Sequence, residues 1–368
     1  MRFPEFSGEW KMCTIGELIT KVGSGVTPRG GEAVYKTEGH PFVRSQNVGL
    51  GNLLLDDIAF IDEETHLRQK NTELQFNDVL LNITGASIGR SALVDKQIVG
   101  GNVNQHVCII RTKENLVPSF ICSFLLSNYG QRQIDSFQAG GNRQGLNFEQ
   151  IKSIKITIPS KDEQIKIAKL LRAIDERIAT QNKIIDKSQS LIKGIAQNVA
   201  RNNKPNIRLS ECLECSSSTL QESDVCKNGT YPVYGANGIV GYLDNYNTEK
   251  EAVYIIKDGS GVGTVSYVTG KCSATGTLNT LQAKEGYSLQ YLYYMLKVFN
   301  FEPYKTGMAI PHIYFKDYGK AKIFCPSYTE QLKYARLLSA IDNKLSAEQS
   351  ILTDLSLQKQ SLLRQMFI

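Results

Sequence analysis

The sequence predicts an α+β protein in which two variable domains are joined by two long antiparallel coiled-coil helices with pseudo-twofold symmetry. Three observations support this class: a long direct repeat, heptad-spaced apolar residues that follow each copy, and strand–glycine–strand runs that precede each copy. A chain of 368 residues is also too long for one ordinary core. The predicted segments are a first domain at 1–160, a central helix at 161–204, a second domain at 205–327 and a C-terminal helix at 328–368.

The repeat is clearest in two helical stretches that lie 167 positions apart. The stretch EQIKIAKLLRAID begins at Glu163 and EQLKYARLLSAID begins at Glu330, and nine of 17 aligned positions are identical. A short β-branched run and a Pro-Ser pair precede each copy. Ser160 and Ser327 stand three residues before these glutamates, which is the spacing of a capping box. Both helices are therefore expected to start at defined points.

Apolar residues continue through both helices at alternating spacings of four and three, which is the pattern of a coiled coil. Gln181 and Glu348 occupy the same repeat position, where a polar residue commonly fixes register. If the helices pair antiparallel, a direct repeat becomes a pseudo-twofold arrangement. Heptads alone also fit a coiled coil that only oligomerises the chain. The predicted seam consists of Leu171, Ile174, Ile178, Gln181, Ile185, Leu338, Ile341, Leu345, Glu348 and Leu352.

The net charge of +6 is concentrated in the helices. Residues 1–160 hold 16 Lys/Arg and 16 Asp/Glu, and residues 205–327 hold 11 of each, so both domains are neutral. Residues 161–204 hold 10 basic and five acidic residues. Any nucleic acid must then meet local clusters and the first helix, although a solvated helix face explains the excess equally well.

No apolar stretch reaches transmembrane length and no signal-peptide pattern begins the chain, so we expect a cytoplasmic protein without a membrane partner. Only Cys212 and Cys215 form a Cys-x-x-Cys pair, and no metal site is predicted. The run at Asp258 is not a phosphate loop, and the four histidines have neither triad nor metal spacing. The sequence therefore predicts no catalytic residues.

The whole chain resembles the specificity subunit of type I restriction-modification systems. The resemblance rests on RFPEFSGEW, ITKVGSGVTPRGG, HPFVRSQNVG, YPVYGANGIVGY, the Pro-Ser approach to each helix and the closing QSLLRQMF. It implies two target-recognition domains, each reading one half of a bipartite double-stranded DNA site. It also implies that the helices set the spacer and bind two modification (methyltransferase) subunits, alongside restriction (translocase and nuclease) subunits. S-adenosylmethionine, ATP and Mg are then expected on those partners, with no cofactor in this chain.

Base reading needs amide, guanidinium and hydroxyl groups on loops, because Arg pairs guanine and Asn or Gln pairs adenine. Three polar loop clusters supply them in the first domain, and scattered polar residues supply them in the second. Two other functions stay open: a coiled-coil scaffold, and a recognition module of another DNA-modification or defence complex. The candidate DNA-binding residues are Arg44, Gln46, Asn47, Asn102, Asn104, Gln105, His106, Asn142, Arg143, Gln144, Tyr234, Asn237, Lys257, Asn279, Thr280, Lys305 and His312.

Overall fold

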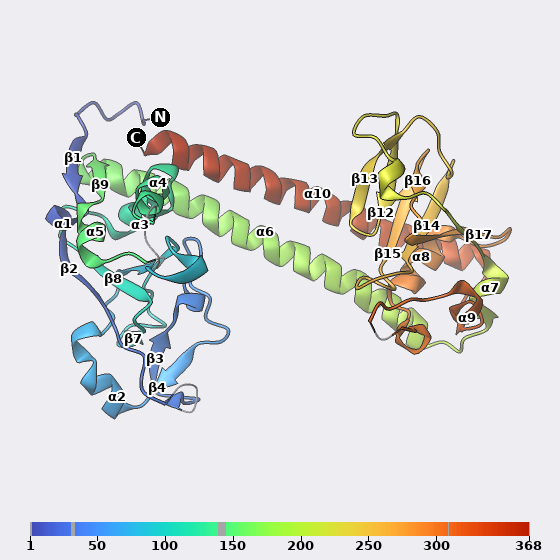
Figure 1. Cartoon of the computed structure of the whole chain (residues 1–368), viewed down its shortest axis with the longest axis horizontal. Helices are drawn as coiled ribbons and strands as arrows, with labels where there is room; N and C mark the ends of the chain where they lie inside the picture. The colour runs from blue at the N-terminus through green and yellow to red at the C-terminus, as the bar shows by residue number, and fades with distance from the viewer. Residues whose placement is uncertain (1, 31–33, 139–144, 308, 368) are drawn as a thin grey trace. The chain divides into compact units, whose positions relative to one another are not determined.

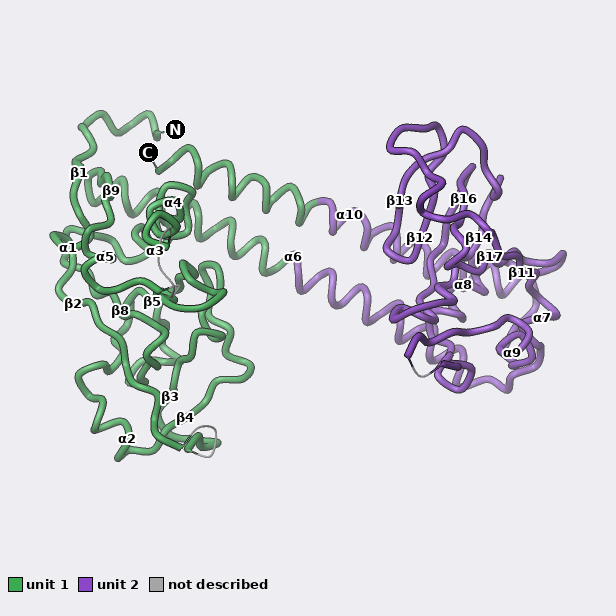
Figure 2. The backbone as a smooth tube through the Cα atoms, in the orientation of Figure 1, with its two compact units in different colours: residues 1–181, 351–368 green, residues 182–350 purple. Residues whose placement is uncertain are grey.

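The computed structural model describes residues 2–30, 34–138, 145–307 and 309–367. The chain forms two compact units, which Figure 2 shows in different colours. Unit 1 contains Met1–Gln181 and Ile351–Ile368, and unit 2 contains Asn182–Ser350. Two long helices, α6 (Lys161–Arg201) and α10 (Tyr328–Met366), each contribute a part to both units. The mixture of sheets and helices confirms the predicted α+β class (Figure 1).

Unit 1 holds a four-stranded sheet in the order β2-β8-β5-β6, a three-stranded sheet in the order β4-β3-β7, and the pair β1–β9. The strands β5 and β8 read VLLN and VCIIRT, and such apolar, β-branched runs suit the buried middle of a sheet. Their antiparallel register places Leu80 opposite Ile109. The bounds are β1 (Lys11–Thr14), β2 (Ile19–Ser24), β3 (His40–Val43), β4 (Ala59–Ile61), β5 (Val79–Asn82), β6 (Ser91–Leu93), β7 (Asn102–Val103), β8 (Val107–Thr112) and β9 (Lys155–Ile158).

Short helices cover this sheet and connect it to α6. Pro118 opens α3, where its missing N–H costs nothing. The rings of Phe120 and Phe124 lie 5.2 and 5.9 Å from that of Phe367, which follows α10. The same core includes Leu171 of α6, so the sheet and short helices of unit 1 pack against the long helices. The bounds are α1 (Ile15–Leu18), α2 (Glu63–Arg68), α3 (Pro118–Leu126), α4 (Asn128–Ser136) and α5 (Phe148–Ser153), with 3-10 turns at Ser45–Asn47, Lys70–Thr72 and Gly85–Ser87.

Unit 2 repeats this topology. Its four-stranded sheet has the order β11-β17-β14-β15, its three-stranded sheet has the order β13-β12-β16, and β10 pairs with β18. In each unit the second strand of the smaller sheet pairs antiparallel on one side and parallel on the other. The bounds are β10 (Ile207–Arg208), β11 (Leu213–Ser217), β12 (Tyr231–Gly235), β13 (Gly238–Leu243), β14 (Glu251–Ile256), β15 (Val265–Thr269), β16 (Ser273–Ala274), β17 (Leu278–Ala283) and β18 (Lys322–Ile323).

The core of unit 2 is rich in tyrosine. Tyr254, Tyr291, Tyr294 and Tyr318 are all at most 2% exposed, and burial raises the pKa of each phenol. A buried phenol needs a partner, and Tyr291 finds one by donating to the carbonyl of Phe324 at 2.8 Å. The helices of this unit are α7 (Leu209–Cys212), α8 (Leu289–Lys297) and α9 (Phe315–Tyr318), with 3-10 turns at Glu222–Asp224 and Glu302–Tyr304.

The repeated Glu-Gln pair explains how each domain is fixed to its helix. Gln164 Oε1 accepts a hydrogen bond from the N–H of Val117 at 2.9 Å, and Gln331 Oε1 accepts one from the N–H of Ser288 at 2.9 Å. The amide nitrogens donate to the preceding proline carbonyls at 3.1 and 2.9 Å. Both glutamines are 1% exposed. Two positions 167 residues apart therefore serve one purpose.

The first expected capping box forms only in part. Ser160 Oγ accepts a hydrogen bond from the N–H of Glu163 at 3.4 Å, as predicted. The buried Glu163 carboxylate instead accepts two hydrogen bonds from Arg2, at 2.9 and 2.8 Å. A bidentate guanidinium stabilises a buried carboxylate better than one backbone N–H does. In the second copy the Ser327 hydroxyl donates to the Glu330 carboxylate at 2.8 Å.

Within each unit the two long helices run antiparallel. In unit 1, Lys359 near the end of α10 forms an ion pair with Asp175 near the start of α6, with 2.5 Å between nitrogen and oxygen. In unit 2, Ile192 near the end of α6 and Leu345 in the first half of α10 line the same cavity. Of the predicted seam residues, Leu171, Ile174, Gln181, Ile185, Leu338 and Leu345 are buried, and Ile178, Ile341, Glu348 and Leu352 are half-buried.

Candidate functional site

Loops that are distant in the sequence meet at one end of the sheets of unit 1. The residues just after β5 form the centre of this group. The N–H of Ile83 donates to the carbonyl of His106 at 3.0 Å, and the carbonyl of Ile83 accepts from the N–H of Leu146 at 2.8 Å. Thr84 forms an antiparallel bridge with Gly145. The segment after β5 is therefore held between the β7–β8 loop and the chain that enters α5.

The loop after β3 joins the same group. Asn82 at the end of β5 donates its side-chain amide to the carbonyl of Ser45 at 2.8 Å. The N–H of Asn104 donates to the carbonyl of Val43 at 3.0 Å. Two of the three predicted polar clusters, VRSQNVG and GNVNQH, thus lie together. The third cluster consists of Asn142, Arg143 and Gln144, which lie outside the described residues.

The side chains of these two clusters differ in what they can offer a ligand. Gln46 and Gln105 are exposed and His106 is half-buried. Arg44 is held by Asp57, whose carbonyl accepts from its guanidinium at 2.7 Å. Polar groups at the surface are the ones that a base edge can reach. Both glutamines are also bonded within the chain, since Gln46 donates to Asp57 and Gln105 accepts from the N–H of Thr27 at 2.8 Å.

Three asparagines of these clusters are buried and bonded within the chain. Asn47 accepts from the N–H of Arg44 and donates to the carbonyl of Leu54, both at 2.9 Å. Asn102 Oδ1 lies 2.7 Å from Nδ1 of His66. Asn104 Oδ1 accepts from the N–H of His106 at 3.0 Å. Contact with a base would require these asparagines to break their present bonds, so in this structure they shape the loops.

Unit 2 contains the same frame of backbone hydrogen bonds. The N–H of Lys257 donates to the carbonyl of Thr277, and the carbonyl of Lys257 accepts from the N–H of Ile313, both at 3.0 Å. Asp258 forms an antiparallel bridge with His312. The N–H of Thr275 donates to the carbonyl of Tyr234 at 2.9 Å. Each of these bonds has a counterpart in unit 1.

The predicted residues of unit 2 fall into two groups. Asn237 is exposed in the turn between β12 and β13, while Tyr234, Lys257, Lys305 and His312 are half-buried around the frame. Lys305 forms an ion pair with Glu302 at 2.6 Å.

Asn279 and Thr280 belong to the buried strand β17 and are 4% and 7% exposed. The amide of Asn279 donates to the hydroxyl of Tyr318 at 3.1 Å and its oxygen accepts from Ser217 at 3.0 Å. Both residues are buried in the sheet of unit 2, so in this structure they support the sheet.

Sequence reasoning missed three residues at the centre of the frame: Asn82, Thr84 and Asp258. Asn82 is fully buried, and its Oδ1 has no hydrogen-bond partner among the described residues. Thr84 lies 2.5 Å from Nδ1 of His106, and Asp258 lies 2.7 Å from Nδ1 of His312. The available signal was the matching strand–glycine–strand run in each half, since the residue just before the glycine turn occupies the same place in both.

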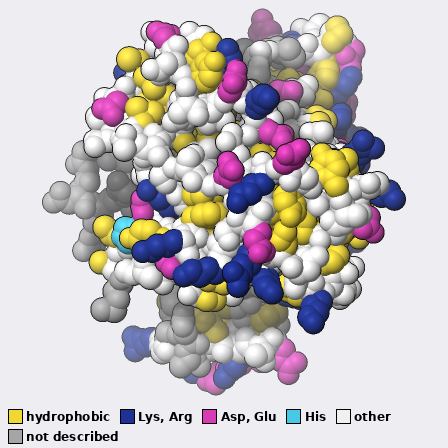
Figure 3. Space-filling model, turned by 90° about the vertical axis from the view of Figure 1, so that its right-hand side faces the viewer, with side chains coloured by type: hydrophobic (Ala, Val, Ile, Leu, Met, Phe, Trp, Pro, Cys, Tyr) yellow, Lys and Arg dark blue, Asp and Glu magenta, His cyan; other side chains and the backbone are white. Residues whose placement is uncertain are grey.

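Basic side chains gather on the face of the molecule drawn in Figure 3. Arg208 and Lys322 of unit 2 are exposed and directly opposite each other in the β10–β18 pair. Like charges in that position repel each other. Lys316 and Lys320 are also exposed in the segment that leads into β18. The neutral sequence of this domain therefore carries a local basic cluster.

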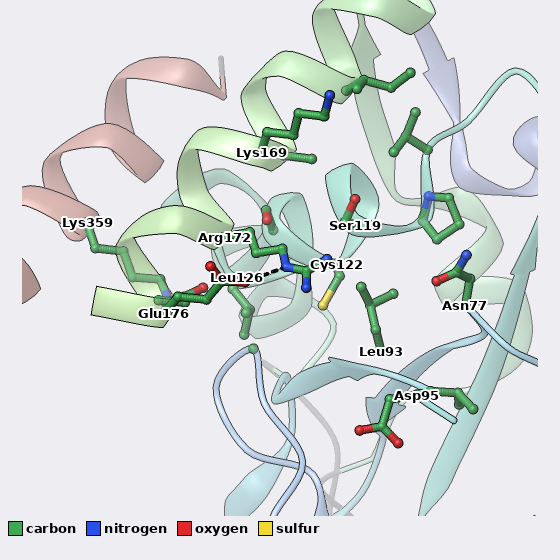
Figure 4. Close-up of a pocket in the computed structure, with 18 of the residues that line it drawn as sticks. Asn77, Leu93, Asp95, Ser119, Cys122, Leu126, Lys169, Arg172, Glu176 and Lys359 are labelled. Atoms are coloured by element: carbon green, nitrogen blue, oxygen red, sulfur yellow. Dashed lines mark hydrogen bonds and ion pairs between the residues drawn. The ribbon is translucent and has the colours of Figure 1, made fainter. Parts of the chain in front are cut away.

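A cavity of 620 Å³ lies between α3, α6 and the end of α10 in unit 1 (Figure 4). Arg172 and Glu176 on α6 form an ion pair at 2.9 Å beside it. The nucleophilic candidate in its wall is Cys122, but burial raises the pKa of this thiol to about 11. A protonated thiol is a poor nucleophile at neutral pH.

The described part of the chain contains neither a metal-binding cluster nor a membrane-spanning helix. No cluster of three or more His, Cys, Asp or Glu side chains there is arranged to hold a metal ion. None of its helices combines the length and apolar character needed to span a membrane.

Comparison with known proteins gives consistent results. The pattern of the type I restriction modification DNA specificity domain matches residues 7–187 and residues 205–356. A putative type I specificity subunit of Mycoplasma genitalium is 24% identical over 320 residues, which covers 79% of this chain and 81% of the relative. The specificity subunit of the type I restriction enzyme EcoprrI of Escherichia coli is 27% identical over 134 residues, which covers 36% of this chain and 32% of the relative.

Solved structures share the fold. The crystal structure of a type I restriction-modification S subunit from M. genitalium matches 100% of this chain and 97% of its own, with a TM-score of 0.68 and 18% identity. A chain from a structural study of complex assembly and conformational transition in the type I R-M system matches 98% of this chain and 97% of its own, with a TM-score of 0.56 and 16% identity.

Proposed function

Since this chain belongs to the type I restriction-modification DNA specificity family, we propose that its two domains each read one half of a bipartite duplex DNA target. Members of this family recognise DNA and leave the chemistry to other subunits, so the chain is a specificity subunit and not an enzyme. The duplicated match of the family pattern, at residues 7–187 and 205–356, supports one reading module in each half.

The observation that carries the proposal is the repeated loop frame with different side chains on it. In unit 1 the frame presents Gln46, Gln105 and His106, and in unit 2 it presents Asn237, Lys257 and His312. Amide, imidazole and ammonium groups distinguish bases by donor and acceptor pattern. One scaffold with two sets of readers is suited to a target whose two halves differ.

The two long helices would separate the half-sites and bind the partners. Their repeated starts at Lys161 and Tyr328 offer two equivalent surfaces, which supports docking of two modification subunits. Those subunits would supply methyl transfer from S-adenosylmethionine. Restriction subunits would supply ATP- and Mg-dependent translocation and cleavage. This chain would contribute recognition and spacing.

Methylation mapping tests this function directly. A host that expresses the chain with its modification subunit should carry methylated adenines in one bipartite motif with a fixed nonspecific spacer, detected by long-read sequencing. The purified chain alone should bind DNA weakly, with a shallow dependence on salt, because its neutral domains release few counterions. Adding the modification subunit should steepen that dependence. A host without any motif, despite a stable complex, would favour a coiled-coil scaffold.

A further inference from the structure

Thr84, the second residue after β5 in unit 1, and Asp258, the second residue after β14 in unit 2, occupy the same position in the two frames. Thr84 bridges Gly145, and Asp258 bridges His312. The residue after each bridge partner donates its N–H to the residue that precedes Thr84 or Asp258. Leu146 donates to the carbonyl of Ile83 at 2.8 Å, and Ile313 donates to the carbonyl of Lys257 at 3.0 Å. The backbone bonds at this position are alike in the two units, whereas the side chains differ.

Each of these side chains is bonded to a histidine, but the two histidines come from different loops. Thr84 Oγ1 lies 2.5 Å from Nδ1 of His106, which belongs to the β7–β8 loop. Asp258 Oδ1 lies 2.7 Å from Nδ1 of His312, which belongs to the segment before α9. The side chain at this position is thus bonded to an imidazole in both units, but the imidazoles come from different parts of the frame.

In unit 1 the hydrogen bonds among the described residues leave a donor for a ligand. Gln105 accepts from the N–H of Thr27 at 2.8 Å, so its amide nitrogen faces Nε2 of His106 at 3.1 Å. An amide nitrogen only donates, so Nε2 accepts and the ring proton is on Nδ1. That proton is donated to Thr84, whose own hydroxyl proton is then available for a ligand. The Thr84–His106 pair therefore presents a hydrogen-bond donor.

In unit 2 the same reasoning leaves an acceptor. A carboxylate only accepts, so Nδ1 of His312 donates to Oδ1 of Asp258. Oδ2 of Asp258 is the remaining acceptor, with Nζ of Lys257 at 3.9 Å. The side chains of Asp258 and His312 are each 35% exposed, so a ligand can reach them.

We propose that Thr84 and Asp258 determine one base position in each half-site, with unit 1 selecting a base that presents an acceptor and unit 2 selecting a base with an amino group. In the major groove guanine O6 and thymine O4 are acceptors, whereas adenine N6 and cytosine N4 are donors. This inference rests on the proposed function and names the chemistry by which its two halves differ. Thr84 and Asp258 are held in the frame by backbone bridges. Their side chains can therefore be changed without removing those bridges.

The test measures binding of the wild-type complex of chain and modification subunit to duplexes in which each base pair of the mapped motif is replaced in turn. The same panel is then bound by Asp258→Asn, which replaces the Oδ2 acceptor by a donor, and by Thr84→Val, which removes the hydroxyl at constant shape. Asp258→Asn should lose roughly 5- to 150-fold of discrimination at one position of one half-site. Thr84→Val should do the same at one position of the other half-site.

Two controls keep the result decisive. Asp244→Asn makes the same charge change just after β13, at the open end of the β12–β13 hairpin where Tyr231 pairs with Leu243. This variant should leave the base preferences unchanged. His312→Gln should affect the same base position as Asp258→Asn, and it decides the matter if that variant does not yield a soluble complex. Unchanged profiles for the variants, or a uniform loss over both half-sites, would overturn the inference. A wild-type complex without any bipartite preference would instead overturn the proposed function.

Discussion

Gln164 and Gln331 allow the meaning of the sequence repeat to be tested by a single matched substitution. Each side-chain amide lies near the start of a long helix. It forms hydrogen bonds with the start of a domain helix and with the proline that precedes the long helix. In Gln164→Leu the N–H of Val117 and the carbonyls of Asn115 and Pro159 lose their partner, and side-chain volume is nearly kept. In Gln331→Leu the affected groups are the N–H of Ser288 and the carbonyl of Pro326.

The magnitude follows from the number of buried groups that are left unpaired. An unsatisfied buried backbone group costs about 1–3 kcal/mol. Because the carbonyls can recover part of that cost by small shifts, we expect Gln164→Leu to lower the free energy of unfolding of unit 1 by about 2–5 kcal/mol. Gln331→Leu should lower that of unit 2 by about 2–4 kcal/mol. Both glutamines are 1% exposed, so solvent does not replace the lost bonds.

Hydrogen exchange followed by mass spectrometry measures the two units separately in one experiment. A loss of 2 kcal/mol corresponds to about 30-fold faster exchange through opening of the affected unit. Each variant should show its larger effect in its own unit. Gln358→Leu, at an exposed position of α10, is the matched control. If both junction variants lie within about 0.5 kcal/mol of that control, the repeated glutamines do not fix the domains and the reasoning fails.

Three further predictions concern spacing, pH and thiol chemistry. Four residues inserted after Asn182 lengthen α6 by ~6 Å, so the methylated motif should gain about one or two spacer base pairs; an unchanged spacer with efficient methylation would contradict this. The hydrogen bond that His40 Nε2 donates to the Glu63 carboxylate at 2.6 Å raises the pKa of His40, so the pair stabilises unit 1 below the unfolded pKa of ~6.5 and loses that effect as pH rises through the folded pKa. Melting scans should show this decline, and Glu63→Gln should remove it; an identical pH dependence in that variant would count against the pair. A thiol reagent at neutral pH should modify exposed Cys226 before Cys108, whose pKa burial raises to about 12, and mass spectrometry showing early labelling of Cys108 would disprove the buried assignment.

Much of the fold was predictable because its signals are local and occur twice. The Pro-Ser-x-x-Glu-Gln pattern places a helix start at two positions, and α6 and α10 begin at Lys161 and Tyr328. The α+β class followed from short β-branched runs around glycine turns. The partner of Glu163 was not predictable, because Arg2 is 161 residues away and no local spacing connects them.

The candidate site was predictable as loops but not as individual side chains. Polar loop residues look alike in a sequence whether they support a loop, as Asn47 and Asn102 do here, or face solvent, as Gln46 does. Burial depends on the sheet that lies behind each loop. The glycine-rich run at Asp258 predicts a hairpin between strands, and that pattern alone indicates no role for the aspartate. Its role in the frame depends on His312, 54 residues away.

The central claim, that each domain reads its own half-site, is tested most directly by exchanging one domain. Residues 206–325 are replaced by the equivalent stretch of a relative, and methylated motifs are mapped by long-read sequencing in a host that also expresses the modification subunit. Because each unit carries its own sheets and its own loop frame, the account predicts that one half of the motif changes while the other half stays the same. A hybrid that methylates efficiently with both halves altered, or with neither altered, would contradict it.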